Sequence, residues 1–146
     1  MLVQKFGGSS LADLDSFIAA AEIISNAAGK EKIVVVLSAM YGITDLLERA
    51  IKTAIEKGDF GVDLDHIKQA EVQVLDEASN AGLDCPESRG YSKQRHQRLE
   101  SRLEGIALQE QCPVDVRAEI LSMGEGFSSR LLSELFCAQG HRALWS

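Results

Sequence analysis

Three short segments of the sequence carry residues that could hold a small anionic molecule. The first is Lys5–Ser10 (KFGGSS), in which a lysine and two glycines precede an expected helix. Glycine lets backbone N–H groups approach an anion, a helix N-terminus carries about half a positive charge, and Lys5 adds a full one. This composition indicates a phosphate site, although neither the GxxxxGK(S/T) nor the GxGxxG spacing is met. The alternative is a tight strand-to-helix turn with Lys5 solvated.

The second segment is Leu37–Asp45, which follows the second of two expected strands and contains two hydroxyl side chains. Ligands of open α/β sheets bind outside the carboxyl ends of the strands, so Ser38 and Thr44 could hydrogen-bond a small polar substrate there. For Thr44 or Asp45 the alternative is a helix N-cap, which is a common use of either residue type.

The third segment is Ser122–Arg130, where Glu125 lies between Gly124 and Gly126. Glycine is unfavourable inside a helix, so we expect the helix to break at Gly124, which could hold Glu125 near a ligand. The alternative is a glutamate that simply favours the start of the next helix.

The elements that must position these segments predict an α/β fold. Residues 2–6 and 33–37 are expected strands, and the second is a β-branched run typical of a strand buried on both faces of a parallel sheet. Between them, Ser10 and Asp13 have the spacing of a capping box, and helical periodicity continues to Gly29. We therefore expect a right-handed βαβ unit in a parallel-containing sheet flanked by helices on both faces.

The remaining sequence predicts mainly helices. Residues 65–111 have helical apolar spacing on both sides of Gly82–Gly90, which indicates an inserted helical hairpin. Pro113 suits the first turn of a following helix. Residues 143–145 begin like a third strand at the end of the sequence, so we expect an incomplete domain with Trp145 in its core.

Composition narrows the functional classes. The 146 residues are 45% hydrophobic and 25% charged, as in ordinary globular proteins, and the net charge of -7 argues against sequence-independent nucleic-acid binding. The three cysteines and three histidines lie at no metal-ligand or disulfide spacing, and the basic stretch at residues 89–102 is expected to be a solvated helix face. With no signal peptide or membrane span in the sequence, we expect a cytoplasmic protein that binds neither nucleic acid nor membrane.

Together, in this order and at this spacing, the three segments resemble the aspartokinases, a branch of the amino acid kinase superfamily. The family opens with lysine, phenylalanine, two glycines and a serine or threonine, as in Lys5–Ser9. Its Leu-Ser-Ala segment with a following Gly-Ile-Thr is matched by Leu37–Thr44, and its Gly-Glu with a serine three positions later by Gly124–Ser128. The resemblance covers all 146 residues, and related kinases share the glycine turn but not the whole combination.

The resemblance implies transfer of the ATP γ-phosphate to the side-chain carboxylate of L-aspartate, giving 4-phospho-L-aspartate, the first step toward lysine, threonine and methionine. Lys5 would be the catalytic residue, in contact with the transferring phosphoryl group. Gly7, Gly8 and Ser9 would line the phosphate end of the nucleotide site. Phosphoryl transfer depends mainly on positioning and charge neutralisation, which a lysine can supply.

The resemblance further implies that Ser38, Thr44 and Glu125 hold aspartate. It also implies that ATP and Mg²⁺ are the cofactors, and that the ligands of the metal lie outside this sequence. It implies a homo-oligomeric parent. The family's kinase domain continues well beyond this length, so we expect residues 1–146 to be its N-terminal part, with a helical insertion at about 65–111 and no activity alone. The alternative is a non-catalytic small-molecule-binding or dimerisation module derived from the same fold.

Overall fold

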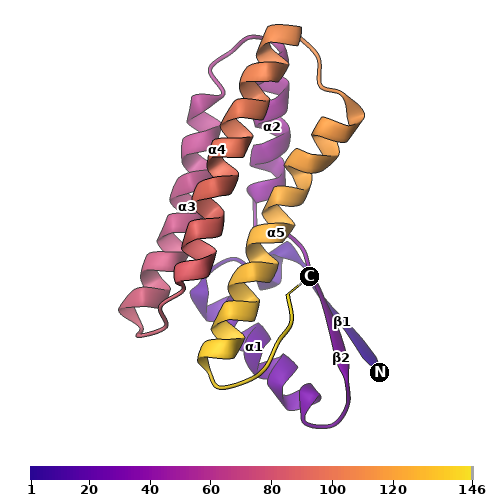
Figure 1. Ribbon diagram of the computed structural model, residues 1–146, viewed down its shortest axis with the longest axis vertical. Helices are drawn as coiled ribbons and strands as arrows, with labels where there is room; N and C mark the ends of the chain where they lie inside the picture. Colours follow the sequence, from indigo (N-terminus) through magenta and orange to yellow (C-terminus); the bar gives the residue numbers. More distant parts are fainter. Residues whose placement is uncertain (146) are drawn as a thin grey trace.

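The computed structural model describes residues 1–145, in which two strands and five α-helices follow one another (Figure 1). The elements are β1 (Leu2–Phe6), the 3-10 turn η1 (Gly8–Ser10), α1 (Leu14–Ala28), β2 (Ile33–Leu37), α2 (Ile43–Ile55), α3 (Gly61–Asn80), α4 (Pro86–Gln109) and α5 (Val114–Ala138). Figure 1 shows the long helices α2 to α5 side by side in one elongated body, with α1 and both strands at its lower end.

β1 and β2 form a two-stranded parallel sheet in which Lys5 lies opposite Val36. The expected α/β class with a parallel sheet and an inserted helical hairpin is confirmed. One sheet face, with Phe6 and Leu37, packs against the hydrophobic core beside α1 and α5. On the other face Val34 and Val36 are 46% and 45% exposed, so β2 is not buried on both faces within residues 1–145, and the expected helices of that face are not among them.

The start of α1 differs from the sequence-based expectation. The helix begins at Leu14, and its N-cap is Asp13, whose carboxylate accepts hydrogen bonds from the backbone N–H and the hydroxyl of Ser16 at 2.8 and 2.7 Å. The hydroxyl and then the backbone N–H of Ser16 hold the pKa of Asp13 below its ordinary value. The expected capping box at Ser10 is therefore wrong, because Ser10 ends the 3-10 turn instead.

The helical hairpin is formed by α3 and α4, and it begins at Gly61, slightly earlier than expected. Pro86 opens α4 rather than lying in the connection, since the first helical position needs no N–H donor. The next two backbone N–H groups, of Glu87 and Ser88, donate to the Glu134 carboxylate of α5 at 3.0 and 2.7 Å. This carboxylate caps α4 in place of a local side chain and ties the hairpin to α5.

One residue of the basic stretch is buried inside the hairpin. His96 Nε2 lies 2.8 Å from Glu71 Oε2 between α4 and α3, and the Ser92 hydroxyl donates to the other oxygen of Glu71 at 3.3 Å. The expectation of a solvated face therefore fails for His96, because its imidazole satisfies a buried carboxylate.

Two further expectations about the C-terminal quarter are wrong. α5 runs without a break through Gly124 and Gly126. Residues 143–145 form no strand, and Trp145, which is 38% exposed, lies over the Arg130 guanidinium at 4.7 Å instead of in the core. Ser146 lies outside the described residues. None of the helices described is long and apolar enough to cross a membrane.

Candidate functional site

The segments that follow β1 and β2 meet because parallel strands end at the same edge of the sheet (Figure 1). The backbone N–H of Ser38 donates to the carbonyl of Phe6 at 3.0 Å, which extends the pairing past the end of β2. A Cβ added at Gly8 would lie 3.4 Å from the carbonyl oxygen of Ala39. The first two segments are therefore in direct contact.

Lys5, Gly7 and Ser38 share the solvent-exposed side of this edge. Lys5 pairs with the exposed Val36, and Gly7 is still extended at φ −83° and ψ 173°, so the alternation of side chains continues through Gly7 and Ser38. A Cβ added at Gly7 would meet no described atom within 4 Å apart from those of its two chain neighbours. Open space therefore lies over Gly7, next to a lysine on one strand and a serine on the other.

The backbone conformation does not account for glycine at position 7. Any residue can adopt a φ of −83°, whereas the positive-φ glycines described are Gly42, Gly82 and Gly140. The helix N-terminus that was expected to add partial positive charge to a phosphate site here does not lie directly after the glycines, because α1 begins at Leu14, after its N-cap Asp13. The 3-10 turn Gly8–Ser10 follows the strand instead, and it carries the exposed Ser9.

Thr44 and Asp45 are not helix caps. The N-cap of α2 is Gly42, whose φ of +81° lies in the left-handed region that glycine adopts without strain. Thr44 is the second residue of α2 and is exposed, so its hydroxyl is not used as an N-cap. The backbone N–H of Ile43 donates to the Met40 carbonyl at 3.0 Å, whereas those of Thr44 and Asp45, also in the first turn, have no acceptor within α2.

The third segment reaches the other two through Gly124. A Cβ at this position would lie 2.7 Å from Ala39 Cβ and 3.3 Å from Ile43 Cγ2, so α5 crosses the β2–α2 connection at a distance that only glycine permits. Glu125, the next residue, is exposed beside this crossing. Ser128 is fully buried and its hydroxyl donates to the Gly124 carbonyl at 3.2 Å, so it belongs to the packed side of α5.

The structure thus gathers the three segments at one sheet edge, and each of the expected site residues there is exposed or half-buried. These residues are Lys5, Gly7, Gly8, Ser9, Ser38, Thr44 and Glu125. Sequence reasoning missed Ala39, the buried residue through which α5 is attached to the edge. The available signal was a glycine inside a helical apolar pattern, which often marks a close approach rather than a break.

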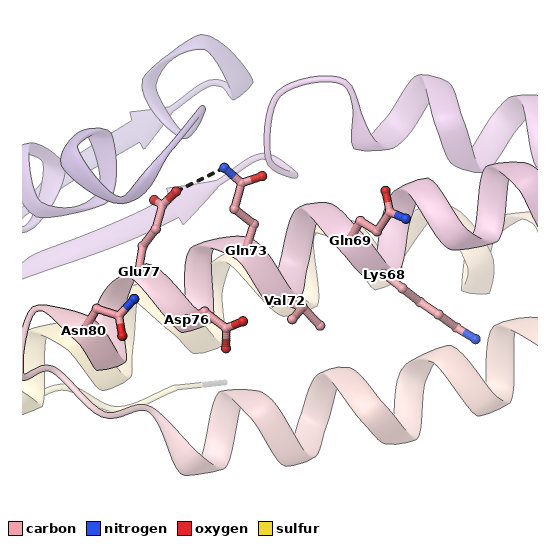
Figure 2. A pocket seen from close by; sticks show the side chains of 7 residues that line it. All are labelled: Lys68, Gln69, Val72, Gln73, Asp76, Glu77 and Asn80. Carbon is pink, nitrogen blue, oxygen red and sulfur yellow. Dashed lines mark hydrogen bonds between the residues drawn. The ribbon is translucent and has the colours of Figure 1, made fainter.

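A shallow groove on the outer face of α3 is separate from this site. Figure 2 shows that its side chains all come from one helix, and within it Gln73 Nε2 donates to Glu77 Oε1 at 3.1 Å. The lining residues are Lys68, Gln69, Val72, Gln73, Asp76, Glu77 and Asn80. None of them belongs to the three segments.

Among the expected site residues at the sheet edge, Glu125 supplies the one carboxylate. Among residues 1–145, no group of three or more histidine, cysteine, aspartate or glutamate side chains is placed to hold a metal. Magnesium is usually bound through one or two carboxylates together with substrate phosphates and water. The chemistry available at this edge is therefore that of a lysine, hydroxyls, backbone N–H groups and one carboxylate.

Comparison with known proteins identifies the family. The sequence matches the model of the amino acid kinase family over residues 1–146. The chain belongs to this family. The expected resemblance to the N-terminal part of an aspartokinase is also confirmed.

The relatives and the solved structure to which this family member is similar are aspartokinases. It is 31% identical over 145 residues to the chloroplastic aspartokinase 3 of Arabidopsis thaliana, covering 97% of this chain and 24% of the relative. It is 29% identical over 143 residues to the bifunctional aspartokinase/homoserine dehydrogenase of Buchnera aphidicola, covering 97% and 18%. Escherichia coli aspartokinase III in complex with aspartate and ADP superimposes with a TM-score of 0.85 at 30% identity, covering 100% and 31%. The chain therefore spans less than a third of each of these proteins.

Proposed function

We propose that residues 1–146 provide the aspartate and phosphate contacts of an aspartokinase, which transfers the ATP γ-phosphate to the side-chain carboxylate of L-aspartate. The product would be 4-phospho-L-aspartate, the first intermediate toward lysine, threonine and methionine. The supporting observation is the meeting of the Lys5, Ser38 and Glu125 segments at one sheet edge, held by the contact of Gly124 with Ala39. A relative of similar fold was solved with aspartate and ADP.

Lys5 is the catalytic residue of this proposal. Its side chain lies on the same side of the edge as the open space over Gly7, where a phosphoryl group could approach the backbone. Negative charge accumulates on the equatorial oxygens of the phosphoryl group during transfer, and an ammonium group beside them stabilises it. Gly8 and Ser9, at the start of the 3-10 turn, would contact the other phosphates.

Aspartate would lie between the β2–α2 connection and α5. The Glu125 carboxylate would pair with its ammonium group, and the hydroxyls of Ser38 and Thr44 would donate to a carboxylate without adding charge repulsion. We assign ATP as the phosphoryl donor, with Mg²⁺ held by its phosphates and by ligands outside residues 1–146. We further propose a cytoplasmic location and a homo-oligomeric protein.

The test is an assay of the complete polypeptide that carries residues 1–146. With ATP and aspartate we expect an acyl phosphate that hydroxylamine traps as aspartyl hydroxamate, and no product with glutamate. The 146-residue chain alone should give no turnover, because it spans less than a third of its solved relative. Calorimetric binding of aspartate without hydroxamate formation by the complete polypeptide would instead favour a non-catalytic binding module.

A further inference from the structure

Two glycines hold opposite sides of α5 close to other parts of the molecule. Because each helical residue turns the chain by 100°, Gly124 and Gly126 lie about 200° apart, with Glu125 between them. Gly124 faces Ala39, as described above. A Cβ added at Gly126 would overlap the hydroxyl of Tyr91 on α4 and lie 3.2 Å from Tyr91 Cζ. The α5 turn that carries Glu125 is thus packed between the β2–α2 connection and the helical hairpin.

The Tyr91 ring is itself held in place. The guanidinium of Arg95, one turn further along α4, lies 4.9 Å from the ring centroid. The ring of Trp145 meets it edge-on, with centroids 5.7 Å apart and planes at 75°. Such contacts each favour one ring orientation, so the hydroxyl end is directed at the Gly126 backbone.

The position of Glu125 depends on these two packing contacts, of Gly124 with Ala39 and of Gly126 with Tyr91. Within residues 1–145 its carboxylate makes no hydrogen bond or ion pair, and the side chain is exposed. No neighbouring side chain therefore orients it, and its location is set by the backbone of α5. A shift of that backbone moves the carboxylate directly.

We infer that Tyr91 is a positioning residue for Glu125: by filling the space beside Gly126, it fixes the α5 turn against Ala39 and so places the carboxylate that binds the substrate ammonium. This inference rests on the proposed function, since it assigns a substrate to Glu125. It gives the helical hairpin a role in substrate affinity. The competing explanation is that Tyr91 only fills a gap between α4 and α5.

The main test is Tyr91→Leu in the complete polypeptide, with hydroxamate formation as the assay. We expect the KM for aspartate to rise about fivefold or more, because a small misplacement of a binding group is costly, while the KM for ATP changes less than about twofold. The matched control is Gly90→Ala, on the same helix next to Tyr91, where an added Cβ meets no described atom within 4 Å. This control should leave both KM values unchanged.

A second arm distinguishes positioning from gap filling. If Tyr91 acts through Glu125, Tyr91→Leu should have no further effect on the KM for aspartate in a Glu125→Gln background. Equal effects in both backgrounds, or equal increases in both KM values, overturn the inference. A wild-type polypeptide that forms no hydroxamate overturns the proposed function and this inference with it, whereas an active wild type with unchanged Tyr91→Leu kinetics overturns the inference alone.

A third arm serves if Tyr91→Leu fails to fold. Gly126→Ala should raise the KM for aspartate, and adding Tyr91→Phe, which removes the overlapping hydroxyl, should restore at least half of the loss on a logarithmic scale. The melting temperature should follow the same order. Recovery of melting without recovery of the KM would show that Tyr91 packs against α5 without positioning Glu125.

Discussion

Replacing Lys5 by alanine is the most direct test of the phosphoryl contact. Lys5 is exposed near the end of β1, and no salt bridge to its ammonium group is formed within residues 1–145. Surface substitutions away from specific contacts usually change stability by less than about 0.5 kcal/mol. The variant should therefore fold as well as the wild type, so that any loss of activity reports on the chemistry.

The expected loss follows from the charge that Lys5 would neutralise. At about 4 Å from a phosphoryl oxygen and an effective dielectric constant of about 20, a unit charge pair interacts by about 4 kcal/mol. If most of this interaction develops only as charge moves in the transition state, kcat should fall by about 10²–10³. The KM for aspartate should change far less, because an interaction made mainly in the transition state lowers kcat without weakening substrate binding.

Steady-state hydroxamate formation by the complete polypeptide measures both constants. Lys32→Ala is the matched control, because Lys32 is an exposed lysine just before β2, at the opposite end of the same sheet. A kcat within twofold of wild type for Lys5→Ala, or an equal loss for Lys32→Ala, would refute the reasoning and return Lys5 to a solvated strand end. A lowered melting temperature would likewise assign Lys5 to folding.

Four further predictions concern the site and its supports. Glu125→Gln should raise the KM for aspartate at least about tenfold, because leaving the substrate ammonium without its countercharge costs about 2 kcal/mol or more. The KM for ATP and the melting temperature should be unchanged, and equal effects on both substrates would contradict the assignment. Gly124→Ala should destabilise the fold by about 1–2 kcal/mol, because crowding against Ala39 exceeds the roughly 1 kcal/mol gained in helix propensity. Adding Ala39→Gly should restore part of the lost stability, and an unchanged melting temperature for Gly124→Ala would count against this packing. Asp13→Ala should lower the melting temperature at neutral pH, and this difference from the wild type should vanish in acid. Because the folded pKa of Asp13 lies below its ordinary 3.8, the stability contributed by the cap is complete above pH 3.8 and disappears as the pH falls through the folded pKa. A melting-temperature difference that stays constant down to low pH would disprove this role of Asp13. Cys85 should react with a thiol reagent at mildly alkaline pH far more slowly than the exposed Cys137, because burial and then the nearby Glu134 raise the pKa of Cys85 to about 11; comparable labelling rates would argue against this burial.

The elements that sequence predicts well are those with a strong local signal. The IVVVL run of β2 forms a strand over Ile33–Leu37, and helical periodicity locates α1, α2 and the hairpin. The chemistry-bearing residues are also local features, because a lysine beside two glycines or a serine after a strand needs no tertiary information. These signals suffice for the fold class and for a list of candidate residues.

The errors arise where contacts distant in sequence decide the outcome. Asp13 rather than Ser10 caps α1 because η1 occupies Gly8–Ser10, and a local spacing rule does not distinguish the two. His96 is buried because Glu71, on the neighbouring helix, offers a partner. Trp145 is held outside the core by Arg130 and Tyr91, two residues that periodicity does not connect with it.

The unbroken α5 shows why the site itself could be only partly predicted. Two glycines cost a helix about 2 kcal/mol relative to alanine, which is the basis for expecting a break at Gly124. The helix continues because each missing side chain admits a neighbour, Ala39 on one side and Tyr91 on the other. A break would have allowed Glu125 to move relative to the β2–α2 connection, whereas the continuous helix fixes its backbone there. The same glycines that weaken α5 locally are thus the residues that attach it to the sheet edge and to the hairpin.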